Sequence, residues 1–426
     1  MITRASARSA ILARNTMPEV LIHTNTTDAL LRSAAQQVFV RILGWSVHMT
    51  TEAETARTSA LPVIAYGDGP IGSGFRIAAL SGDDALADPF RDPIRFTSVM
   101  LTTWQGSGAT DEHGRSRTHE LLVHRKGWID RPIVDEVVLD LARRLQAVLP
   151  GLPPVRRTYR HIATLDVDNG FKYLGRPVWR TIGSAARDLL HGRMGELKDR
   201  AATLLGARPD PYDAYDHFHE VNSGNADRTI TNFLVAPHGK FDHAVGLSSR
   251  RMIRRMQAIA QWSDVGLHPS YFASEKPQLF AKEKAALEAA IAQPVFASRQ
   301  HFLRFRSPET FLELERIGIK EDHSIGLHDA IGFRAGTCTP FPFYDVENDR
   351  ETALMIVPFQ VMASARADKM KLTPDEAIAA GKQVIDKVKA VQGTFIGVWH
   401  ERFISDHGAE KGWRRVVEET IRYAKP

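Results

Sequence analysis

Past residue 160, the chain alternates between short apolar runs and longer stretches in which apolar residues recur every three or four positions. Short apolar runs are typical of buried strands, whereas the longer spacing is typical of amphipathic helices. The runs predict strands at 162–167, 231–236, 265–268, 296–302, 317–323, 354–361 and 394–399. The helical spacing predicts helices at 249–263, 279–292, 308–317, 374–391 and 413–424. Strands that alternate with helices favour a parallel α/β barrel over a β-sandwich.

The first 150 residues have a mixed pattern. It predicts strands at 20–23, 62–66 and 75–80, and helices at 28–43 and 132–149. The segment PGLPP at 150–154 would end the last helix and stiffen a linker, because proline and glycine both disfavour a helix. We therefore expect a small mixed α/β N-terminal domain over 1–150, without an assigned role, and a second domain over 155–426.

Two local features follow from the same pattern. Thr373 and Ser307 each precede a proline at the start of a helical stretch, which predicts that both hydroxyls cap a helix. The stretch 332–352 has neither a strand nor a helix pattern and is too long for an ordinary connection. We expect a functional loop there.

Composition excludes several classes of protein. The 55 Lys and Arg residues against 50 Asp and Glu leave a net charge of +5, which is small for 426 residues and argues against nucleic acid as a partner. The single cysteine, Cys338, excludes an internal disulfide and a zinc ribbon, and a buried or loop thiol is favoured over a nucleophile. No apolar run approaches the roughly 18 residues of a spanning helix. The expected setting is cytoplasmic.

Three further motifs have simpler explanations than a ligand site. The segment 67–72 matches G-x-G-x-x-G, but it leads into a strand-like stretch instead of the helix that a dinucleotide site requires. Four arginines within 250–255 could meet phosphate, yet their spacing fits a solvated helix face. Three arginines within 1–14 superficially resemble a transit peptide, and a short lead-in before the first strand explains them equally well.

The most informative segment is HIATLDVDNG at 161–170. Residues two apart on a strand point the same way, with Cα atoms about 6.6 Å apart. Asp166 and Asp168 would therefore present both carboxylates at the end of a strand, an arrangement that suits a metal ligand beside a base. A calcium loop is disfavoured because Gly170 and Phe171 follow instead of alternating oxygen ligands. Two solvated acids at a strand end are the structural alternative.

Three more predicted strands end in polar side chains. They are the segments VGLHPS at 265–270, ASRQHF at 297–302 and GVWHE at 397–401. In a parallel barrel the C-terminal ends of all strands meet on one face. A set of residues far apart in sequence could therefore lie together: Asp166, Asp168, His268, Arg299, His301 and His400.

The ordered set TLDVD, GLHPSY, SRQHFLRF and VWHE resembles the motif series of polysaccharide deacetylases, carbohydrate esterase family 4. Within that family it is most similar to a subgroup that occurs with surface-polysaccharide genes and carries an extra N-terminal domain. The resemblance covers about residues 158–425. It implies a distorted (β/α) barrel of about seven parallel strands, a divalent metal that is usually zinc, and removal of an N-acetyl group from an amino sugar.

The resemblance also implies a role for each matching residue. Asp166 matches the general base of the family, and Asp168 matches its carboxylate metal ligand. His268 matches the first metal histidine. Arg299 matches the arginine that orients the base, and His400 matches the histidine that acts as general acid.

On this mapping the metal site is incomplete, because Phe272 stands where the family has its second metal histidine. A catalytic zinc normally has three protein ligands. His301 lies two residues after Arg299 on the same strand face, so its imidazole could reach the metal from the neighbouring strand. Its alternatives are to bind substrate or to cap the strand. Other candidates for the third ligand are Ser270, Tyr271 and His238.

The resemblance implies an amino sugar or glycan as the partner and leaves the sugar and the oligomeric state open. Candidate substrate contacts are Arg334 in the loop at 332–340, Tyr271, Trp399 and Glu401. Two alternatives remain. One is a hydrolase of another C–N bond, such as a small cyclic amide, because a fold does not fix a substrate. The other is a non-catalytic carbohydrate-binding or assembly protein that lost the metal, which Phe272 permits.

Overall fold

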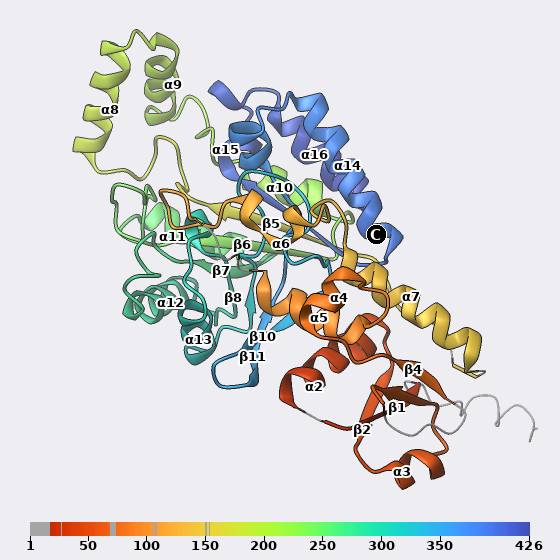
Figure 1. Cartoon of the computed structure of the whole chain (residues 1–426). Helices are drawn as coiled ribbons and strands as arrows, with labels where there is room; N and C mark the ends of the chain where they lie inside the picture. Colours follow the sequence, from red (N-terminus) through yellow and green to blue (C-terminus); the bar gives the residue numbers. More distant parts are fainter. Residues whose placement is uncertain are drawn as a thin grey trace, which may run out of the picture. The chain divides into compact units, whose positions relative to one another are not determined.

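A computed structural model of the chain describes residues 18–26, 28–68, 74–104, 106, 109–149, 151–152 and 154–426 (Figure 1). The chain forms two compact units. The first takes the chain up to Thr102 together with Val134–Arg157, and the second takes Thr103–Ile133 and Thr158–Pro426. Three expectations lie wholly or partly outside the described residues: the glycine motif at 67–72, the linker at 150–154 and the arginines within 1–14.

The segment 103–133 belongs to the second unit, although its position in the sequence predicted it within the N-terminal domain. Its aromatic and backbone contacts explain the difference. The ring of Trp104 packs edge-on against Phe305 and Phe311. The backbone N–H of Phe333 donates to the carbonyl of Ile129 at 2.7 Å. These contacts join the segment to helix α13 and to irregular stretches of the second unit.

The described part of the first unit contains a parallel four-stranded sheet in the order β2-β1-β3-β4. Its strand β1 is buried along all but its first residue, as expected for a strand covered on both faces. The strands are β1 Glu19–Thr24, β2 Ser46–Thr50, β3 Val63–Tyr66 and β4 Phe75–Ile77. The helices are α2 Ala29–Ala35, the π-helical η1 Gln36–Ile42, α3 Ala53–Thr58, α4 Gly82–Ala87, α5 Pro93–Thr103 and α7 Ile133–Val148.

The described part of the second unit contains a nine-stranded sheet in the order β10-β11-β9-β8-β7-β6-β5-β13-β12. All neighbours are parallel except β10 and β11, which form an antiparallel pair. The strands are β5 Arg160–Val167, β6 Arg228–Leu234, β7 Asp264–His268, β8 Ala297–Ser298, β9 Glu321–Asp322, β10 Phe341–Asp345, β11 Arg350–Ile356, β12 Val361–Met362 and β13 Thr394–His400. The expected parallel α/β architecture is confirmed. A closed barrel of seven strands is not, because the strand order has two ends, β10 and β12.

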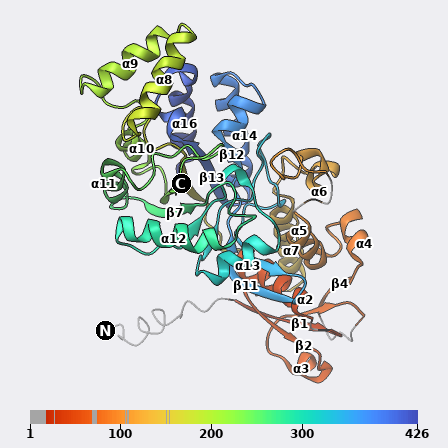
Figure 2. The ribbon, with the colours of Figure 1, turned by 90° about the vertical axis from the view of Figure 1, so that its left-hand side faces the viewer.

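Helices separate most of these strands in the sequence and are found throughout the second unit (Figure 2). They are α8 Val178–Leu190, α9 Met194–Leu204, α10 Tyr215–Asn222, α11 Arg250–Ile259, α12 Gln278–Ile291, α13 Glu309–Arg316, α14 Pro374–Ala390, α15 Glu401–Ile404 and α16 Trp413–Tyr423. Short helices are η2 Thr118–Glu120, α6 Leu122–Arg125, η3 His301–Leu303, η4 Ala365–Lys369 and η5 Gly408–Glu410. None of the described helices has the length and apolar character needed to cross a bilayer.

One local expectation is confirmed and two differ from the structure. Thr373 caps α14, in a capping box with Glu376. Ser307 does not cap α13, which begins only at Glu309 after the N-cap residue Pro308. The stretch 332–352 contains β10 and the start of β11, because its apolar residues pair across the sheet edge.

Candidate metal centre

Neighbouring strands place five polar side chains at one end of the parallel sheet. Asp166 near the end of β5 stands in register with His400 on β13 and with Asn232 on β6. His268 is the last residue of β7. Asp168 follows β5 directly. Parallel strands present their C-terminal ends at the same edge, so these residues converge although they come from different parts of the chain.

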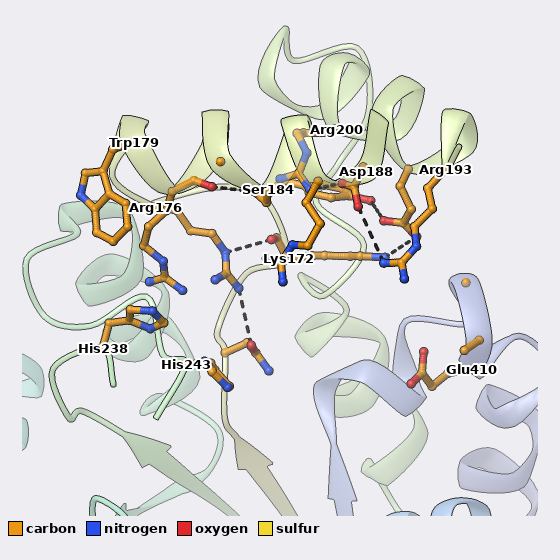
Figure 3. A pocket seen from close by; sticks show the side chains of 18 residues that line it. Lys172, Arg176, Trp179, Ser184, Asp188, Arg193, Arg200, His238, His243 and Glu410 are labelled. Carbon is orange, nitrogen blue, oxygen red and sulfur yellow. Dashed lines mark hydrogen bonds and ion pairs between the residues drawn. The ribbon is translucent and has the colours of Figure 1, made fainter. Parts of the chain in front are cut away.

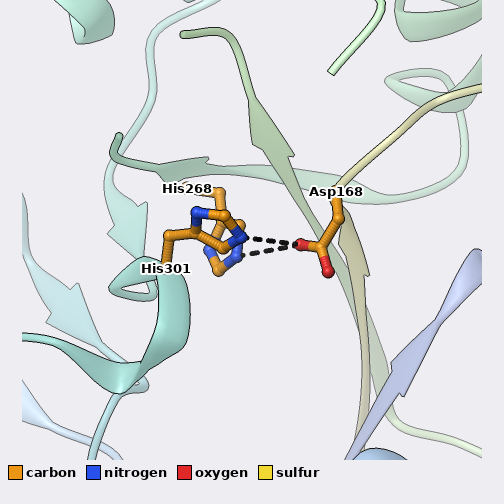
Figure 4. A group of neighbouring side chains, drawn as sticks. All are labelled: Asp168, His268 and His301. Carbon is orange, nitrogen blue, oxygen red and sulfur yellow. Dashed lines mark ion pairs between the residues drawn. The ribbon is translucent and has the colours of Figure 1, made fainter. Parts of the chain in front are cut away.

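Asp168, His268 and His301 form a cluster (Figure 4). One ligand atom from each lies within 4.8 Å of the other two. Oδ1 of Asp168 is 3.3 Å from Nε2 of His268 and 3.7 Å from Nε2 of His301. All three side chains line one cavity of about 260 Å³. One carboxylate and two imidazoles are a donor set with which proteins hold a divalent metal ion.

The hydrogen bonds at Nδ1 of His268 and His301 leave both Nε2 atoms able to bind a cation. Nδ1 of His268 donates to the carbonyl oxygen of Arg299 at 2.5 Å, and Nδ1 of His301 donates to Oδ1 of Asp242 at 3.0 Å. A neutral imidazole with its proton on Nδ1 has a lone pair on Nε2. Oδ1 of Asp168 is buried without a hydrogen-bond partner. Three acceptor atoms that face one another need a shared cation between them, so these residues fit a divalent metal.

The charges around the cluster shift the pKa values of its residues in the direction opposite to that expected from burial. Burial alone would lower the pKa of His268, but the carboxylates of Asp166 and Asp168 raise it above its ordinary value. Burial alone would raise the pKa of Asp168, but the neighbouring imidazoles of His268, His301 and His400 hold it well below its ordinary value. The site therefore favours a carboxylate and a positive charge together.

The backbone directly after His301 is in an uncommon conformation. Phe302 and Leu303 have φ angles of 59° and 54°, in the left-handed region that non-glycine residues rarely adopt. The carbonyl of Phe302 accepts a hydrogen bond from Nη1 of Arg115 at 3.3 Å. Such backbone is kept where surrounding contacts hold it in place, often at functional sites.

Asp166 is held as an ionised and oriented carboxylate. Its Oδ1 accepts hydrogen bonds from Nη1 of Arg299 at 2.9 Å and from Nδ2 of Asn232 at 2.8 Å. Burial would raise its pKa, but the charges of Arg299, His268 and His400 and the hydrogen bond from Asn232 together outweigh burial, and the pKa is lowered overall. Both bonds go to Oδ1, and Asp166 lines the cavity. Oδ2 is thus the oxygen through which Asp166 can take a proton.

Gly266 makes the position of Asn232 possible. The two residues are register partners on β7 and β6. A Cβ at position 266 would overlap Oδ1 of Asn232. The absence of a side chain at Gly266 therefore lets Asn232 reach Asp166.

His400 and Glu401 complete the end of β13. Nε2 of His400 lies 4.0 Å from Oδ2 of Asp168, and its Nδ1 is buried without a hydrogen-bond partner. Burial lowers the pKa of His400. Glu401 accepts hydrogen bonds from the backbone N–H groups of Asp168 at 3.3 Å and Asn169 at 2.6 Å, and burial raises its pKa to about 7. Glu401 therefore fixes the chain around the metal cluster instead of reaching into the cavity.

The other expected substrate contacts are not brought to this cavity. Trp399 is fully buried on β13, with the guanidinium of Arg366 5.2 Å from its ring. The hydroxyl of Tyr271 lies 2.9 Å from Nδ1 of His113. Arg334 is buried and donates to the carbonyl of Gly326 at 3.3 Å. Each is engaged with the protein itself.

The remaining candidates for the third ligand lie outside the cluster. Neither Ser270 nor Tyr271 lines the cavity. The ring of Phe272, which stands where a second metal histidine was expected, is 40% exposed and does not line it either. His238 lies instead in a second cavity.

Sequence patterns missed the residues that orient the site. Asp242 sits in an irregular stretch and has no local pattern that marks it. Asn232 is an amide inside the apolar run of β6, which was a usable signal, because a buried polar side chain needs a partner. Other residues around the cavity were also missed: Arg115, Gln300, His328, Lys369 and Arg402.

A second cavity of about 920 Å³ begins at the residue after Asp168 (Figure 3). Asn169 lines this cavity, as does His243, the neighbour of Asp242. Many of the lining side chains are basic, and most of these belong to the segment around α8 and α9: Lys172, Arg176, Arg180, Arg187, Arg193 and Arg200.

No protein-family model matches this sequence, and no curated protein matches it significantly. Solved structures with a distant likeness include a candidate polysaccharide deacetylase from Mycobacterium smegmatis, at 12% identity and a TM-score of 0.38 over 62% of this chain and 84% of that one. The polysaccharide deacetylase Bc1974 from Bacillus cereus is 10% identical, with a TM-score of 0.29 over 63% of this chain and 88% of its own. The pseudoenzyme BA3943 of carbohydrate esterase family 4, from Bacillus anthracis, is 9% identical, with a TM-score of 0.26 over 61% and 62%. Likenesses this distant carry no weight for function, which has to be argued from the site itself.

Proposed function

We propose that this protein is a metal-dependent hydrolase that removes an N-acetyl group from an amino sugar in a surface polysaccharide or its precursor. The observation that carries the proposal is the cluster of Asp168, His268 and His301 beside an oriented carboxylate, Asp166, and a buried imidazole, His400. This set contains the groups that amide hydrolysis needs: three ligands, a base and an acid. The alternative that lost its metal site is disfavoured, because His301 supplies the ligand that Phe272 cannot.

Zinc is the metal we propose for the cluster, because one carboxylate and two neutral imidazoles suit it. When bound, a divalent metal acts as a Lewis acid that polarises a carbonyl and lowers the pKa of a water. Asp242 and the carbonyl of Arg299 hold the two imidazoles with Nε2 toward the metal position. Such outer partners typically strengthen metal binding, since they fix the tautomer and the orientation of the ring.

Asp166 acts as the general base in this proposal. Arg299 and Asn232 occupy its Oδ1, so a water is deprotonated at Oδ2 as it attacks the acetyl carbonyl. Arg299 is itself held by hydrogen bonds to Thr164 and to the carbonyl of His323. It acts as a positioning residue, because it is buried and does not line the cavity.

His400 is the proposed general acid. An amine leaves poorly as an anion, so a proton has to reach the sugar nitrogen as the C–N bond breaks. His400 lines the same cavity as Asp166 and has an Nδ1 without a partner. It can take up a proton there and hand it to the leaving amine.

The barrel of about seven strands is also part of the proposal. The segment between β11 and β12 forms backbone hydrogen bonds with two strands that lie far apart in the strand order, β9 and β13. The N–H of Val357 donates to the carbonyl of Asp322, at 2.9 Å, and the N–H of Gln360 donates to the carbonyl of Ile396, at 3.1 Å. These bonds support a ring in which one continuous segment joins β9 to β13, which would bring all strand ends to one face.

The proposal is tested by measuring acetate released from a panel of N-acetylated amino sugars, free, nucleotide-linked, lipid-linked and polymeric, with zinc-loaded protein. We expect acetate and free amine in equal amounts, and about 10²- to 10⁴-fold less of both with Asp166→Asn. Asp386→Asn, an exposed change on α14, is the matched control and should keep full activity. Turnover of a cyclic amide without acetate release from any sugar would favour the other hydrolase instead.

A further inference from the structure

Helix α8 is amphipathic, but it turns its apolar side outward. Trp179, Ile182 and Leu190 are 68%, 64% and 85% exposed, whereas Asp188 is buried. At 100° per residue, the apolar residues of α8 fall on one face and the polar ones on the opposite face. A surface helix of a globular protein normally does the reverse.

Exposed apolar residues are concentrated in the segment that holds α8 and α9. Of the 14 large hydrophobic side chains exposed in the described chain, eight lie between Val178 and Leu205. We call this set the apolar face; it consists of Val178, Trp179, Ile182, Leu189, Leu190, Met194, Leu204 and Leu205. Monomeric soluble proteins rarely expose so many apolar residues together, so this surface calls for a partner.

The same segment is strongly basic. Residues 176–208 contain seven Lys or Arg and three Asp or Glu, a net charge of +4, against +5 for the whole chain. All three acids are paired locally: Asp188 with Arg200 at 2.6 Å, Glu196 with Lys172 at 2.9 Å and Asp199 with Arg208 at 2.6 Å. Arg176 donates to the backbone carbonyls of Lys172 and Phe171 and lies in the basic cavity of Figure 3. The segment therefore carries an excess of positive charge, and Arg180 and Arg187 lie on the side of α8 opposite its apolar residues.

We propose that the α8–α9 hairpin docks onto an anionic lipid bilayer, with its apolar face at the level of the headgroups. An amphipathic helix with apolar and aromatic residues on one side and arginines on the other is typical of helices that lie in a membrane interface. Trp179 is of the residue type that favours that depth. A second copy of this chain fits the surface less well, because it would bring two basic segments together.

The proposal is tested by sedimenting purified full-length protein with vesicles of phosphatidylcholine alone and with equal parts of phosphatidylglycerol. We expect binding to the anionic vesicles only, weakened by high salt. Trp179→Ser with Ile182→Ser and Leu190→Ser should abolish it. The double variant Arg180→Gln with Arg187→Gln should weaken binding to anionic vesicles about 30-fold. Each arginine is expected to contribute about fivefold, and the two factors multiply. Phe296→Ser with Val346→Ser, exposed apolar residues elsewhere, is the matched control and should bind normally.

Two readouts separate the bilayer from other occupants. Trp179→Phe should still bind the vesicles but lose part of the blue shift in tryptophan emission that lipid contact causes. Inorganic phosphate should not compete at salt-matched concentrations, because the surface recognises a bilayer and not a single anion. Equal binding of the triple serine variant would overturn the proposal. So would a wild-type dimer that does not bind vesicles and becomes monomeric in that variant.

Discussion

Nδ1 of His301 lies 3.0 Å from Oδ1 of Asp242, although the two residues are 59 positions apart in the sequence. The same oxygen accepts the backbone N–H of Tyr271 at 3.0 Å. Asp242 thereby links the segment after β7 to the segment after β8 and fixes the ring of His301. A carboxylate behind a metal histidine is a common arrangement, because it sets the tautomer and the direction of the lone pair.

Asp242→Asn should weaken zinc binding by about 10- to 100-fold, the usual cost of losing an outer partner of a metal histidine. The amide can still accept a hydrogen bond but no longer offers a negative charge to Nδ1–H. Zinc affinity, measured by competition with a chelator, is the readout. Asp386→Asn should leave the affinity unchanged. An unaltered affinity in Asp242→Asn would show that the pair does not support the metal.

Asp166→Asn should keep zinc and lose turnover by about 10²- to 10⁴-fold, as expected when a general base is removed. The substitution leaves Oδ1 for Arg299 and Asn232 and places an amide where the proton would be taken. Zinc content and kcat are measured on the same preparation. Loss of zinc equal to that in Asp168→Ala would reverse the roles of the two carboxylates.

His400→Ala should also keep zinc, because His400 is not one of the three clustered ligands. We expect the rate to fall most for substrates with the most basic leaving amine, which depend most on a general acid. A series of N-acyl substrates with amines of different basicity provides the test. A rate equal to that of the wild type would remove His400 from the mechanism.

The site residues at the strand ends could be predicted from sequence. The residues that orient their side chains could not. Parallel strands share an edge, so Asp166, His268 and His400 were expected to meet. Their meeting depends only on strand type and chain direction. Asp242 was missed because an irregular loop has no period that shows where its side chains lie.

The structure differs from the sequence-based interpretation at Trp399 and at the helices between β5 and β6, for different reasons. Trp399 was expected to contact substrate, but successive residues of a strand point to opposite faces, so it points away from His400, and it is fully buried. The helices between β5 and β6 were also missed. The apolar residues of α8 and many of those of α9 are exposed, so their pattern does not indicate how these two helices pack.

His161 should make stability depend on pH independently of the metal. It is buried, its Nδ1 donates to the carbonyl of Asn225 at 2.6 Å, and burial lowers its pKa to about 4. An unfolded chain has a histidine pKa near 6.5, so it binds more protons between these values. Its contribution is therefore complete above pH 6.5 and is lost as the pH falls toward 4, by up to about 3 kcal/mol.

Urea unfolding at several pH values measures this contribution. His161→Phe should show a smaller loss of unfolding free energy between pH 6.5 and 4 than the wild type, whatever its stability at neutral pH. His119→Gln, an exposed histidine, should follow the wild type. An identical slope in His161→Phe would place the acid sensitivity elsewhere.

The central claim is that Asp168, His268 and His301 together hold one metal ion, with His301 in place of the ligand that Phe272 does not provide. The most direct test is the zinc content and zinc affinity of the wild type and of His301→Ala, with Tyr271→Phe and Ser270→Ala as neighbouring controls. We predict about one zinc per wild-type chain and a loss in His301→Ala comparable to that in His268→Ala, with both controls unchanged. A wild-type protein that binds no zinc, or a His301→Ala variant with wild-type affinity, would contradict the claim.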